Sequence, residues 1–280
     1  MITIDGNGLA AKIKDELKSE IDSYEIKPIL AVITIGDDES SKVYVNNKKK
    51  ACNYVGISFL HFDYVSFVKE AEVIKKIEEL NKDNKVSGII VQLPLPKGYD
   101  VNKIINTINN NKDVDGLTNE SIGKLINKED GFIPCTPKGI MSIFDYYKIN
   151  LEGKNVVIIG RSNLVGKPLI QECLKKDATV TICHSKTSDL KSYTKKADIL
   201  IVATGIKHLI NKTMIKKDSV IIDVGINKVN NKLYGDVNPN VEEKCSYLSP
   251  VPGGVGPMTV VMLLQNTLTA YKKINGIKNE

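Results

Sequence analysis

Two features that would place this chain in a membrane or in an oxidising compartment are missing from its sequence. The first residues, from Met1 to Leu17, contain no apolar segment of the signal-peptide type, and the longest apolar runs, such as 29–35, have the length of a strand. The five cysteines are odd in number, widely spaced and without any C-x-x-C pair. They argue against a disulfide framework and a zinc site, so we expect a metal-free chain in the reducing cytoplasm, with no membrane partner.

The sequence also lacks a basic stripe with interleaved aromatic residues, which is typical of nucleic-acid-binding surfaces. Its 39 basic and 33 acidic residues leave a net charge of +6 that is spread along the chain. Runs such as Lys48–Lys50 are usually solvated helix or loop faces. This balance suits small anionic ligands, and we expect no nucleic acid as a partner. With 280 residues, 42% of them hydrophobic, the chain can bury a full core in two modest domains or one large one.

Helical and strand patterns alternate through the first part of the chain. Apolar residues recur every four positions from Leu9 to Ile21, after Asp5, which predicts an opening helix capped by that aspartate. The elements that follow are a strand at 29–35, a helix at 39–55 ended by Gly56, a strand at 57–62, a helix at 68–80, a strand at 86–93 and a helix at 101–108 capped by Asp100. Such alternation implies right-handed crossovers and a mainly parallel sheet.

A second α/β module follows an Asn-rich stretch at 106–116, so we place the domains at residues 1–118 and 119–280. Thr136 followed by Pro137 is a cap and first-turn signature for a helix that runs to about Lys148. Four short strands rich in Val and Ile are predicted at 155–159, 178–183, 198–203 and 219–224. They predict a second, mainly parallel sheet, and the last helix, at about 257–272, can pack back on the first domain.

A glycine turn, from Gly160 to Pro168, joins the first of these four strands to a helix predicted to begin near Val165. At this point a parallel sheet offers backbone N–H groups and a helix dipole to a phosphate group. The spacing is not that of the G-x-G-x-x-G fingerprint. The turn by itself therefore fits a dinucleotide site and a plain strand-to-helix connection equally well.

The residues after the next strand favour NADP over NAD. Sites that prefer NAD usually place Asp or Glu there to bind the ribose 2′-hydroxyl, whereas this chain has His184, Ser185 and Lys186. A hydroxyl and two potential cations, with Arg161 across the turn, would receive a 2′-phosphate. An ordinary polar loop is the alternative interpretation of the same residues.

Eight long and unusual strings follow one another along nearly the whole chain. They are YVNNK from Tyr44, GIIVQLPLP from Gly88, DVDG from Asp113, PCTPKG from Pro134, GRSNLVGKP from Gly160, CHSKT from Cys183, DVGIN from Asp223 and PVPGGVGPMT from Pro250. In this order they resemble the bifunctional methylenetetrahydrofolate dehydrogenase/cyclohydrolases. The resemblance implies an N-terminal α/β domain for folate binding and catalysis and a Rossmann-like NAD(P)-binding domain. It also implies a homodimer of one-carbon metabolism that serves purine biosynthesis.

Carried over position by position, the resemblance implies a catalytic lysine at Lys48 with Tyr44 beside it, Gln92 as its hydrogen-bonding partner and Asp115 as a pterin ligand. Tyr44 and Lys48 are four apart on a predicted helix and so project from one face, unlike the next two lysines. A carboxylate matches the paired N–H donors of a pterin edge. The implied substrate-binding set is Tyr44, Gln92, Leu93, Asp115, Pro252, Gly253 and Gly254, and the implied cofactor-binding set is Gly160, Arg161, Ser162, His184, Ser185 and Ile226.

Without the resemblance, several of these residues fit plainer roles. Asp113 and Asp115 are typical turn formers, and Gln92 fits a satisfied amide at a strand end. The segment 250–257, rich in Pro and Gly, fits a rigid connection as well as a surface for a flat ligand. The residues at 118–121 depart from the family's usual pattern, which leaves contacts around this segment open.

The implied reaction has two steps. A hydride passes from the methylene bridge of 5,10-methylenetetrahydrofolate to NADP, and water then opens the resulting methenyl form to 10-formyltetrahydrofolate. The first step depends on positioning, and the second needs an acid or base, for which Lys48 beside a cationic intermediate is the candidate. The alternatives are another two-domain NADP oxidoreductase, of the shikimate dehydrogenase type with Lys48 as its base, and a basic nucleotide-binding module.

Overall fold

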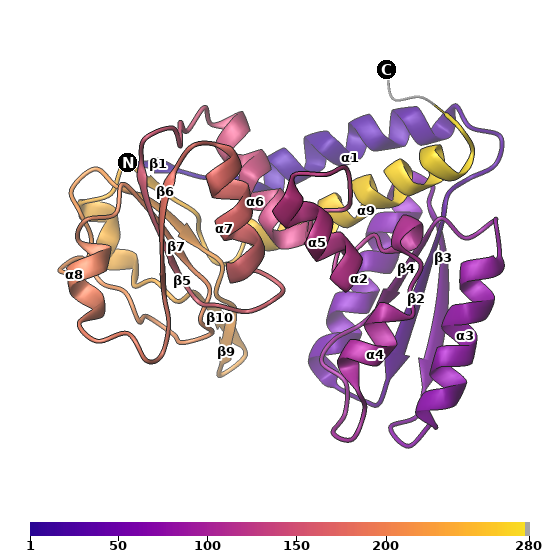
Figure 1. Ribbon diagram of the computed structural model, residues 1–280. Coiled ribbons are helices and arrows are strands. Elements are labelled where there is room, and N and C mark those ends of the chain that lie inside the picture. The colour runs from indigo at the N-terminus through magenta and orange to yellow at the C-terminus, as the bar shows by residue number, and fades with distance from the viewer. Residues whose placement is uncertain (278–280) are drawn as a thin grey trace. The chain divides into compact units, whose positions relative to one another are not determined.

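The computed structural model describes residues 1–277, apart from the side chain of Ser40, and contains two compact α/β units (Figure 1). The three-stranded unit consists of Ala11–Cys135 and the residues from Val260 on. The six-stranded unit consists of Met1–Ala10 and Thr136–Thr259. Each unit therefore combines two segments that are separate in the sequence, which differs from the predicted division at residue 118.

Two sets of contacts explain this division. In the three-stranded unit, the Asn266 side chain near the C-terminus donates to the carbonyl oxygens of Val114 and Ile133, at 2.9 and 3.2 Å. In the six-stranded unit, the N-terminal Ile2 and Ile4 donate their backbone N–H groups to the strand around Leu248. Tertiary pairing of this kind leaves no local signal in the sequence.

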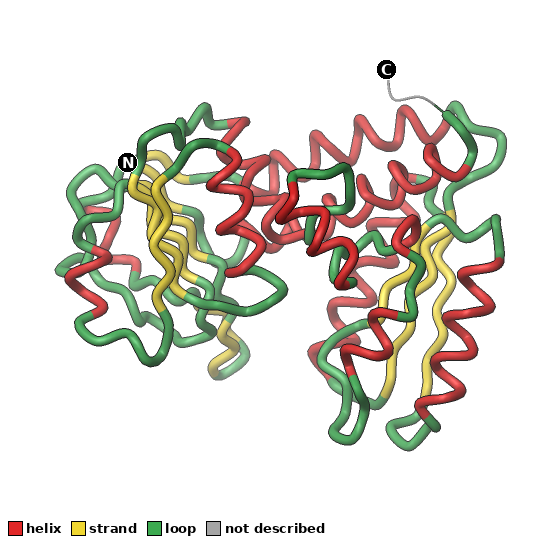
Figure 2. Tube along the Cα trace, in the orientation of Figure 1, coloured by secondary structure: helices red, strands yellow, loops and turns green. Residues whose placement is uncertain are grey.

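A parallel sheet in the order β3–β2–β4 forms the centre of the three-stranded unit, with helices on both of its faces (Figure 2). Its strands are β2 (Ile29–Ile35), β3 (Ser58–Tyr64) and β4 (Gly88–Val91), and its principal helices are α2 (Glu39–Val55), α3 (Glu70–Lys82) and α4 (Val101–Asn106). Ala31, Ile33 and Ile35 pack with α3 and α4, while Leu30 and Val32 are buried on the opposite face. The middle strand is thus apolar on both sides, as expected of a covered parallel sheet.

Helix α2 begins and ends where the sequence predicts. Its N-cap Asp38 accepts a hydrogen bond from the Ser41 N–H at 2.7 Å, and Gly56 closes its C-terminus with a φ of 85°, a left-handed conformation that suits glycine. These caps fix the position along the helix of every side chain that α2 presents.

The six-stranded unit contains one parallel sheet in the order β1–β11–β8–β7–β5–β6. Its strands are β1 (Ile2–Thr3), β5 (Asn155–Ile159), β6 (Thr179–Cys183), β7 (Ile199–Val202), β8 (Val220–Asp223) and β11 (Tyr247–Leu248). Strand order reverses at β5, because β6 lies on one side of it and β7 on the other. In open parallel sheets, ligands bind outside the carboxyl ends of the strands at such a switch point.

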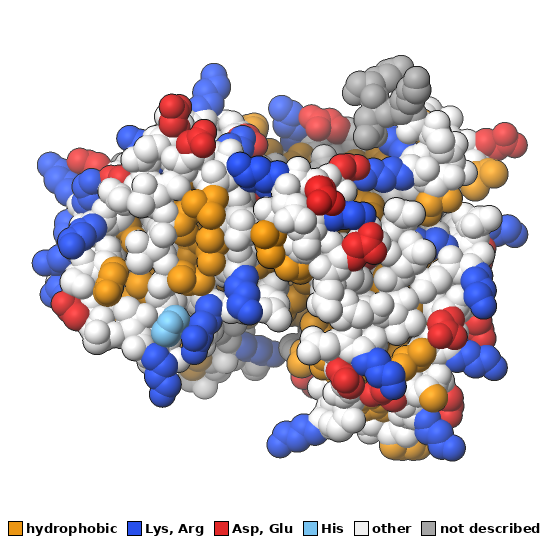
Figure 3. Space-filling model, in the orientation of Figure 1, with side chains coloured by type: hydrophobic (Ala, Val, Ile, Leu, Met, Phe, Trp, Pro, Cys, Tyr) orange, Lys and Arg blue, Asp and Glu red, His pale blue; other side chains and the backbone are white. Residues whose placement is uncertain are grey.

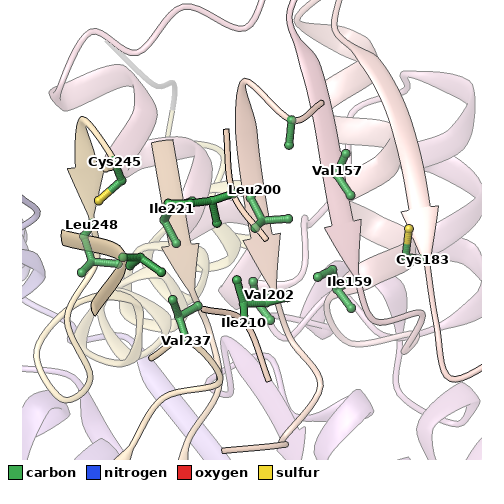
Figure 4. Packing of buried hydrophobic residues seen from close by; sticks show 13 residues of the cluster. Val157, Ile159, Cys183, Leu200, Val202, Ile210, Ile221, Val237, Cys245 and Leu248 are labelled. Atoms are coloured by element: carbon green, nitrogen blue, oxygen red, sulfur yellow. The ribbon is translucent and has the colours of Figure 1, made fainter. Parts of the chain in front are cut away.

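One face of this sheet is covered by an apolar cluster (Figure 4). Alternate residues of neighbouring strands, such as Val157 and Ile159 of β5 and Leu200 and Val202 of β7, project into it. Their burial holds the strands in register, and so fixes the loops that leave the carboxyl ends.

The other elements complete the two units. They are α1 (Gly6–Asp22), α5 (Asn119–Asn127), α6 (Cys135–Tyr146), α7 (Gly166–Lys175), α8 (Leu190–Thr194), α9 (Val255–Ile274), β9 (Asn227–Val229) and β10 (Lys232–Tyr234), with short 3₁₀ turns at Asn110–Lys112 and Pro239–Glu243. The predicted cap role of Thr136 is wrong, because α6 already begins at Cys135 and the Thr136 hydroxyl meets that of Thr259 at 3.0 Å. Over residues 1–277, no helix combines the length and apolar character needed to cross a bilayer.

Two buried aspartates tie together the loops that follow β7, β8 and β10. Asp223 and Asp236 are 3% and 0% exposed. The Asp223 carboxylate accepts from the backbone N–H groups of Gly225, Asp236 and Val237, and the Asp236 carboxylate accepts from the backbone of Thr204 and Gly205 and from the side chains of Thr204 and Asn227. Because an added Cβ at Gly235 would lie 1.8 Å from Asp223 Oδ2, this network also requires glycine there.

Titration of Asp223 should therefore change stability with pH. Burial raises the pKa of Asp223 from its ordinary 3.8 to about 6, against the opposing effect of its three backbone donors. The folded chain then binds the proton on Asp223 more tightly than the unfolded chain does. The contribution of Asp223 to the free energy of unfolding therefore falls by about 3 kcal/mol as pH rises from about 4 to about 6. Urea denaturation of the wild type and of Asp223→Asn across this range measures the difference.

The exposed Asp218, in the same unit, provides the control for that measurement. Asp218→Asn should leave the pH dependence of stability as it is in the wild type. If the difference in free energy of unfolding between the wild type and Asp223→Asn stayed constant with pH, it would contradict the raised pKa of Asp223.

Candidate active site

The structure joins Lys48 and Gln92 directly. Lys48 Nζ on α2 donates to Gln92 Oε1 at 2.9 Å, and Gln92 Nε2 donates to the Leu93 carbonyl oxygen at 2.8 Å. Gln92 follows the last residue of β4, so the buried sheet fixes the amide that holds the amine. Lys48 is half-buried, whereas Lys49 and Lys50 are exposed. The prediction that Lys48 points in a different direction from Lys49 and Lys50 is confirmed.

Asp113 and Asp115, two residues apart, have different roles. Asp113 is 1% exposed, and its carboxylate accepts from the Thr118 N–H at 2.8 Å and from the Ser121 hydroxyl at 2.6 Å. It is a structural residue, as its interpretation as a turn former predicts. Thr118 caps α5, so the segment 118–121 supports the turn that ends at Asp115.

The carboxyl group of Asp115 interacts electrostatically with Lys48. Burial raises the pKa of Asp115, while the positive charge of Lys48 and a hydrogen bond with Cys135 oppose that rise and the charge of Asp113 adds to it. Cys135 was not among the predicted site residues, although it lies inside the PCTPKG string. The three-stranded unit thus brings together an amine, a carboxamide and a carboxyl group.

Two ionisable neighbours of Lys48 on α2 have pKa values that burial raises. Tyr44, one turn earlier, is 41% exposed, and burial of the rest of the side chain raises the pKa of its phenol. Cys52, one turn later, is fully buried, and burial raises the pKa of its thiol to about 12. An uncharged thiol of this kind is a packing group. Leu93 is half-buried beside Gln92.

The glycine turn after β5 brings backbone segments too close together for side chains. An added Cβ at Gly160, whose φ is 120°, would lie 2.2 Å from the Ala203 carbonyl oxygen, and one at Gly166 would lie 2.1 Å from the Gly160 carbonyl oxygen. The Ser162 hydroxyl accepts from the Val165 N–H at 3.1 Å just before α7 begins. This turn, at the switch point of the sheet, fits the diphosphate of a dinucleotide.

The loop after β6 fits a 2′-phosphate. Arg161, Ser185 and Lys186 are exposed, while the half-buried His184 accepts from the Lys186 N–H through Nδ1 at 3.2 Å. No carboxylate follows β6 before Asp189, so a bare ribose lacks its usual partner. His184 therefore shapes the loop, and the exposed groups are those able to contact a phosphate.

The segment 250–257 lies in the six-stranded unit and is supported by the N-terminus. The Asn7 N–H donates to the Gly253 carbonyl oxygen at 3.1 Å, and an added Cβ at Gly6 would lie 1.8 Å from the Gly254 carbonyl oxygen. The exposed Pro252 precedes these glycines. Ile226, 44% exposed, lies near Gly256. No local sequence pattern indicates that Gly6 and Asn7 support this loop, because they are more than 240 positions away from it.

Residues 1–277 contain no group of three or more His, Cys, Asp or Glu side chains arranged to hold a metal ion. The five cysteines are buried thiols and form no disulfide.

Comparison with known families matches two parts of the chain to one family of enzymes. Residues 4–115 match the catalytic domain of tetrahydrofolate dehydrogenase/cyclohydrolase, and residues 134–275 match the NAD(P)-binding domain of the same enzymes. The chain belongs to the tetrahydrofolate dehydrogenase/cyclohydrolase family. A relative named bifunctional protein FolD, from Thermodesulfovibrio yellowstonii, is 52% identical over 274 residues, 96% of each chain.

Solved structures of this family are also similar. Bifunctional FolD from Campylobacter jejuni has a TM-score of 0.96 and 45% identity, over 98% of this chain and 99% of that chain. The Trypanosoma brucei enzyme, solved with NADP and an inhibitor, has a TM-score of 0.93 and 33% identity, over 97% of both chains. A shikimate dehydrogenase from Aquifex aeolicus, with a TM-score of 0.55 and 16% identity over 92% of this chain and 96% of that chain, shares the fold alone.

Gly160→Ala should weaken the binding of NADP(H) by at least about tenfold and lower stability by about 2 kcal/mol, because the left-handed backbone and the Ala203 carbonyl leave no room for a Cβ. Fluorescence titration with NADPH and thermal unfolding measure the two effects. Gly123→Ala is the matched control, since a Cβ on this glycine of α5 meets nothing within 4 Å. Equal NADPH affinity in the two variants would show that the turn does not form the dinucleotide site.

Proposed function

We propose that this chain oxidises 5,10-methylenetetrahydrofolate to the 5,10-methenyl form with NADP and hydrolyses that form to 10-formyltetrahydrofolate. The observation that carries the proposal is the hydrogen bond between Lys48 and Gln92, with Asp115 in electrostatic range of the same amine. Membership of the dehydrogenase/cyclohydrolase family supports both activities. The resemblance to shikimate dehydrogenase extends to the fold only, so a hydroxy acid is not the proposed substrate.

Oxidation requires positioning and the exclusion of water. When bound, the nicotinamide supplies the hydride acceptor. Asp115 orients the pterin through its paired N–H donors, and Tyr44 stacks on the aminobenzoyl ring. Leu93 supplies apolar contact to the substrate. Pro252, Gly253 and Gly254 belong to the proposed substrate-binding set because a stiff segment without side-chain bulk suits flat rings. The contribution of these residues to rate is the fixed approach of the substrate carbon.

Hydrolysis requires proton transfer. The oxygen of water bonds to the methenyl carbon, and one proton of that water leaves. The bond from this carbon to N5 then breaks, its electron pair stays on N5, and N5 takes up a proton as the hydroxyl loses one to become the formyl carbonyl. One water is consumed and one proton is released overall. Lys48 is the group placed to move these protons, and Gln92 orients it.

NADP is the proposed cofactor. Arg161, Ser185 and Lys186 present a guanidinium, a hydroxyl and an ammonium beside the loop after β6, which suits a phosphate on the ribose. His184 supports the loop, Gly160 and Ser162 form the diphosphate turn, and the exposed Ile226 offers an apolar surface to the nicotinamide.

A nucleic-acid-binding module is not favoured. On the face shown in Figure 3, Lys and Arg side chains are interspersed with acidic and neutral ones. A surface that tracks a phosphate backbone needs basic residues along a continuous path.

We further propose a homodimer that acts in purine biosynthesis in the cytoplasm. Five buried thiols support a reducing compartment. The outer edge of β3 pairs with no other strand within residues 1–277, and Leu60, Val65 and Phe67 on or after this strand are 39%, 56% and 84% exposed. An open edge beside apolar side chains supports a contact with a second copy.

The proposed activity is tested with Lys48→Met. Loss of the amine should lower the rate of methenyltetrahydrofolate hydrolysis at least about 100-fold, because no other group replaces it, while NADP binding stays intact. Absorbance assays that follow NADPH and the methenyl compound separately measure the two steps. Lys49→Met, which alters the exposed neighbour, should keep both activities; unchanged hydrolysis in Lys48→Met would remove Lys48 from the reaction.

The dimer is tested with Phe67→Glu. Light scattering coupled to gel filtration should give twice the mass of one chain for the wild type and the mass of a single chain for this variant, because burial of the new charge in the interface is unfavourable. Ile26→Glu alters another exposed apolar residue, 68% exposed, and should leave the mass unchanged. Wild-type protein with the mass of one chain would exclude the homodimer.

A further inference from the structure

A polar cavity lies in the three-stranded unit, between the start of α2 and the carboxyl ends of all three strands. Its volume is about 190 Å³. Thr34 of β2, His61 and Asp63 of β3 and Gln92 after β4 line it from the sheet, and Ser41 lines it from the helix. Such a volume holds several water molecules.

The polar groups of the cavity disfavour an anion and an apolar occupant. The Thr34 hydroxyl donates to Asp63 Oδ1 at 2.6 Å and meets His61 Nε2 at 2.9 Å. Lys42 forms an ion pair with Asp37, and Asp38 already accepts from the N–H of Ser41 at the N-terminus of α2. An anion would meet the charges of Asp38 and Asp63, and an apolar group would meet several polar side chains.

One buried atom in this cavity requires a hydrogen-bonding occupant. Ser41 Oγ is buried and makes no hydrogen bond to any group within residues 1–277. Buried hydroxyl groups are satisfied in nearly all proteins, by protein groups or by ordered water. Water fits the other polar walls, and a rotation of the Ser41 side chain towards the cavity lets its hydroxyl bond to that water.

Gln92 connects the cavity to the reacting amine. The same carboxamide that lines the cavity accepts the hydrogen bond from Lys48 Nζ. A water molecule in the cavity is therefore one side chain away from the group that moves protons in hydrolysis. Hydrolysis consumes one water for each methenyl group, whereas hydride transfer uses none.

We infer that the cavity lined by Thr34, Ser41, His61 and Gln92 holds the water consumed in the hydrolytic step and supplies it past Gln92 to Lys48. This inference rests on the proposed function. The bond changes are those of the hydrolytic step described above, with the attacking oxygen coming from the cavity and the released proton passing to Lys48. Thr34, Ser41 and His61 are positioning residues for that water.

The test uses Ser41→Val and Thr34→Val, which replace the hydroxyl groups of the cavity wall with apolar groups. In the full-length chain, each variant should lower kcat for methenyl hydrolysis by about tenfold or more and leave kcat for the dehydrogenase within about twofold. KM for the methenyl substrate should change little, because the folate site is intact. Ser58→Val, at the exposed start of β3 outside the cavity, should change neither activity.

Ser41→Val keeps the test decisive if Thr34→Val is unstable, because Ser41 Oγ makes no hydrogen bond that its removal would break. Unchanged hydrolysis in folded Ser41→Val, or an equal fall in both activities, would overturn the inference. Wild-type protein without either activity would instead overturn the proposed function, so the two failures are distinguishable.

Discussion

One hydrogen bond, from the Lys48 amine to the Gln92 carboxamide, holds the end of a long flexible side chain in a fixed place. A lysine side chain loses substantial rotamer freedom when it is ordered, so a fixed acceptor is needed. The acceptor is fixed because Gln92 follows a buried strand and its own amide group donates to the Leu93 carbonyl. The caps of α2 at Asp38 and Gly56 fix the other end of this link. The chemistry of the site therefore depends on the packing of the three-stranded sheet.

Four aspartates of this chain differ in their hydrogen-bond partners and therefore in their roles. Asp113 accepts three hydrogen bonds from residues 117–121, and its charge is used to hold a turn. Asp115 instead interacts with the positive charge of Lys48 and forms a hydrogen bond with Cys135. In the other unit, Asp223 and Asp236 hold three loops at the cofactor edge through seven hydrogen bonds from neighbouring backbone and side-chain groups. Each carboxylate that stabilises a loop thus accepts several hydrogen bonds, as expected of a buried charged group.

The sequence predicts the elements that carry a long periodic pattern. The strands at Ile29–Ile35 and Asn155–Ile159 and the helix at Glu39–Val55 have the predicted bounds, since their apolar runs and caps are local signals. Strands β1 and β11 contain two residues each and exist only through pairing with distant segments. The resemblance implied the hydrogen bond between Lys48 and Gln92. Three other features arise from tertiary contacts: the different surroundings of Asp113 and Asp115, the contact of Cys135, and the support of Gly253 by Asn7. The sequence thus predicts the candidate residues of the site much better than the contacts that hold them in place.

The two steps of the reaction place opposite demands on one site. Hydride transfer proceeds best where water is excluded, because the methenyl product is open to hydrolysis, yet the second step needs one water in contact with the same carbon. A site open to bulk solvent would meet the second demand and fail the first. Under the proposal above, the polar cavity lined by Ser41, Thr34, His61 and Gln92 meets both demands, because its water is supplied to the carbon past the amide that also holds Lys48. The same hydrogen bond then links the supply of water to the group that takes its proton.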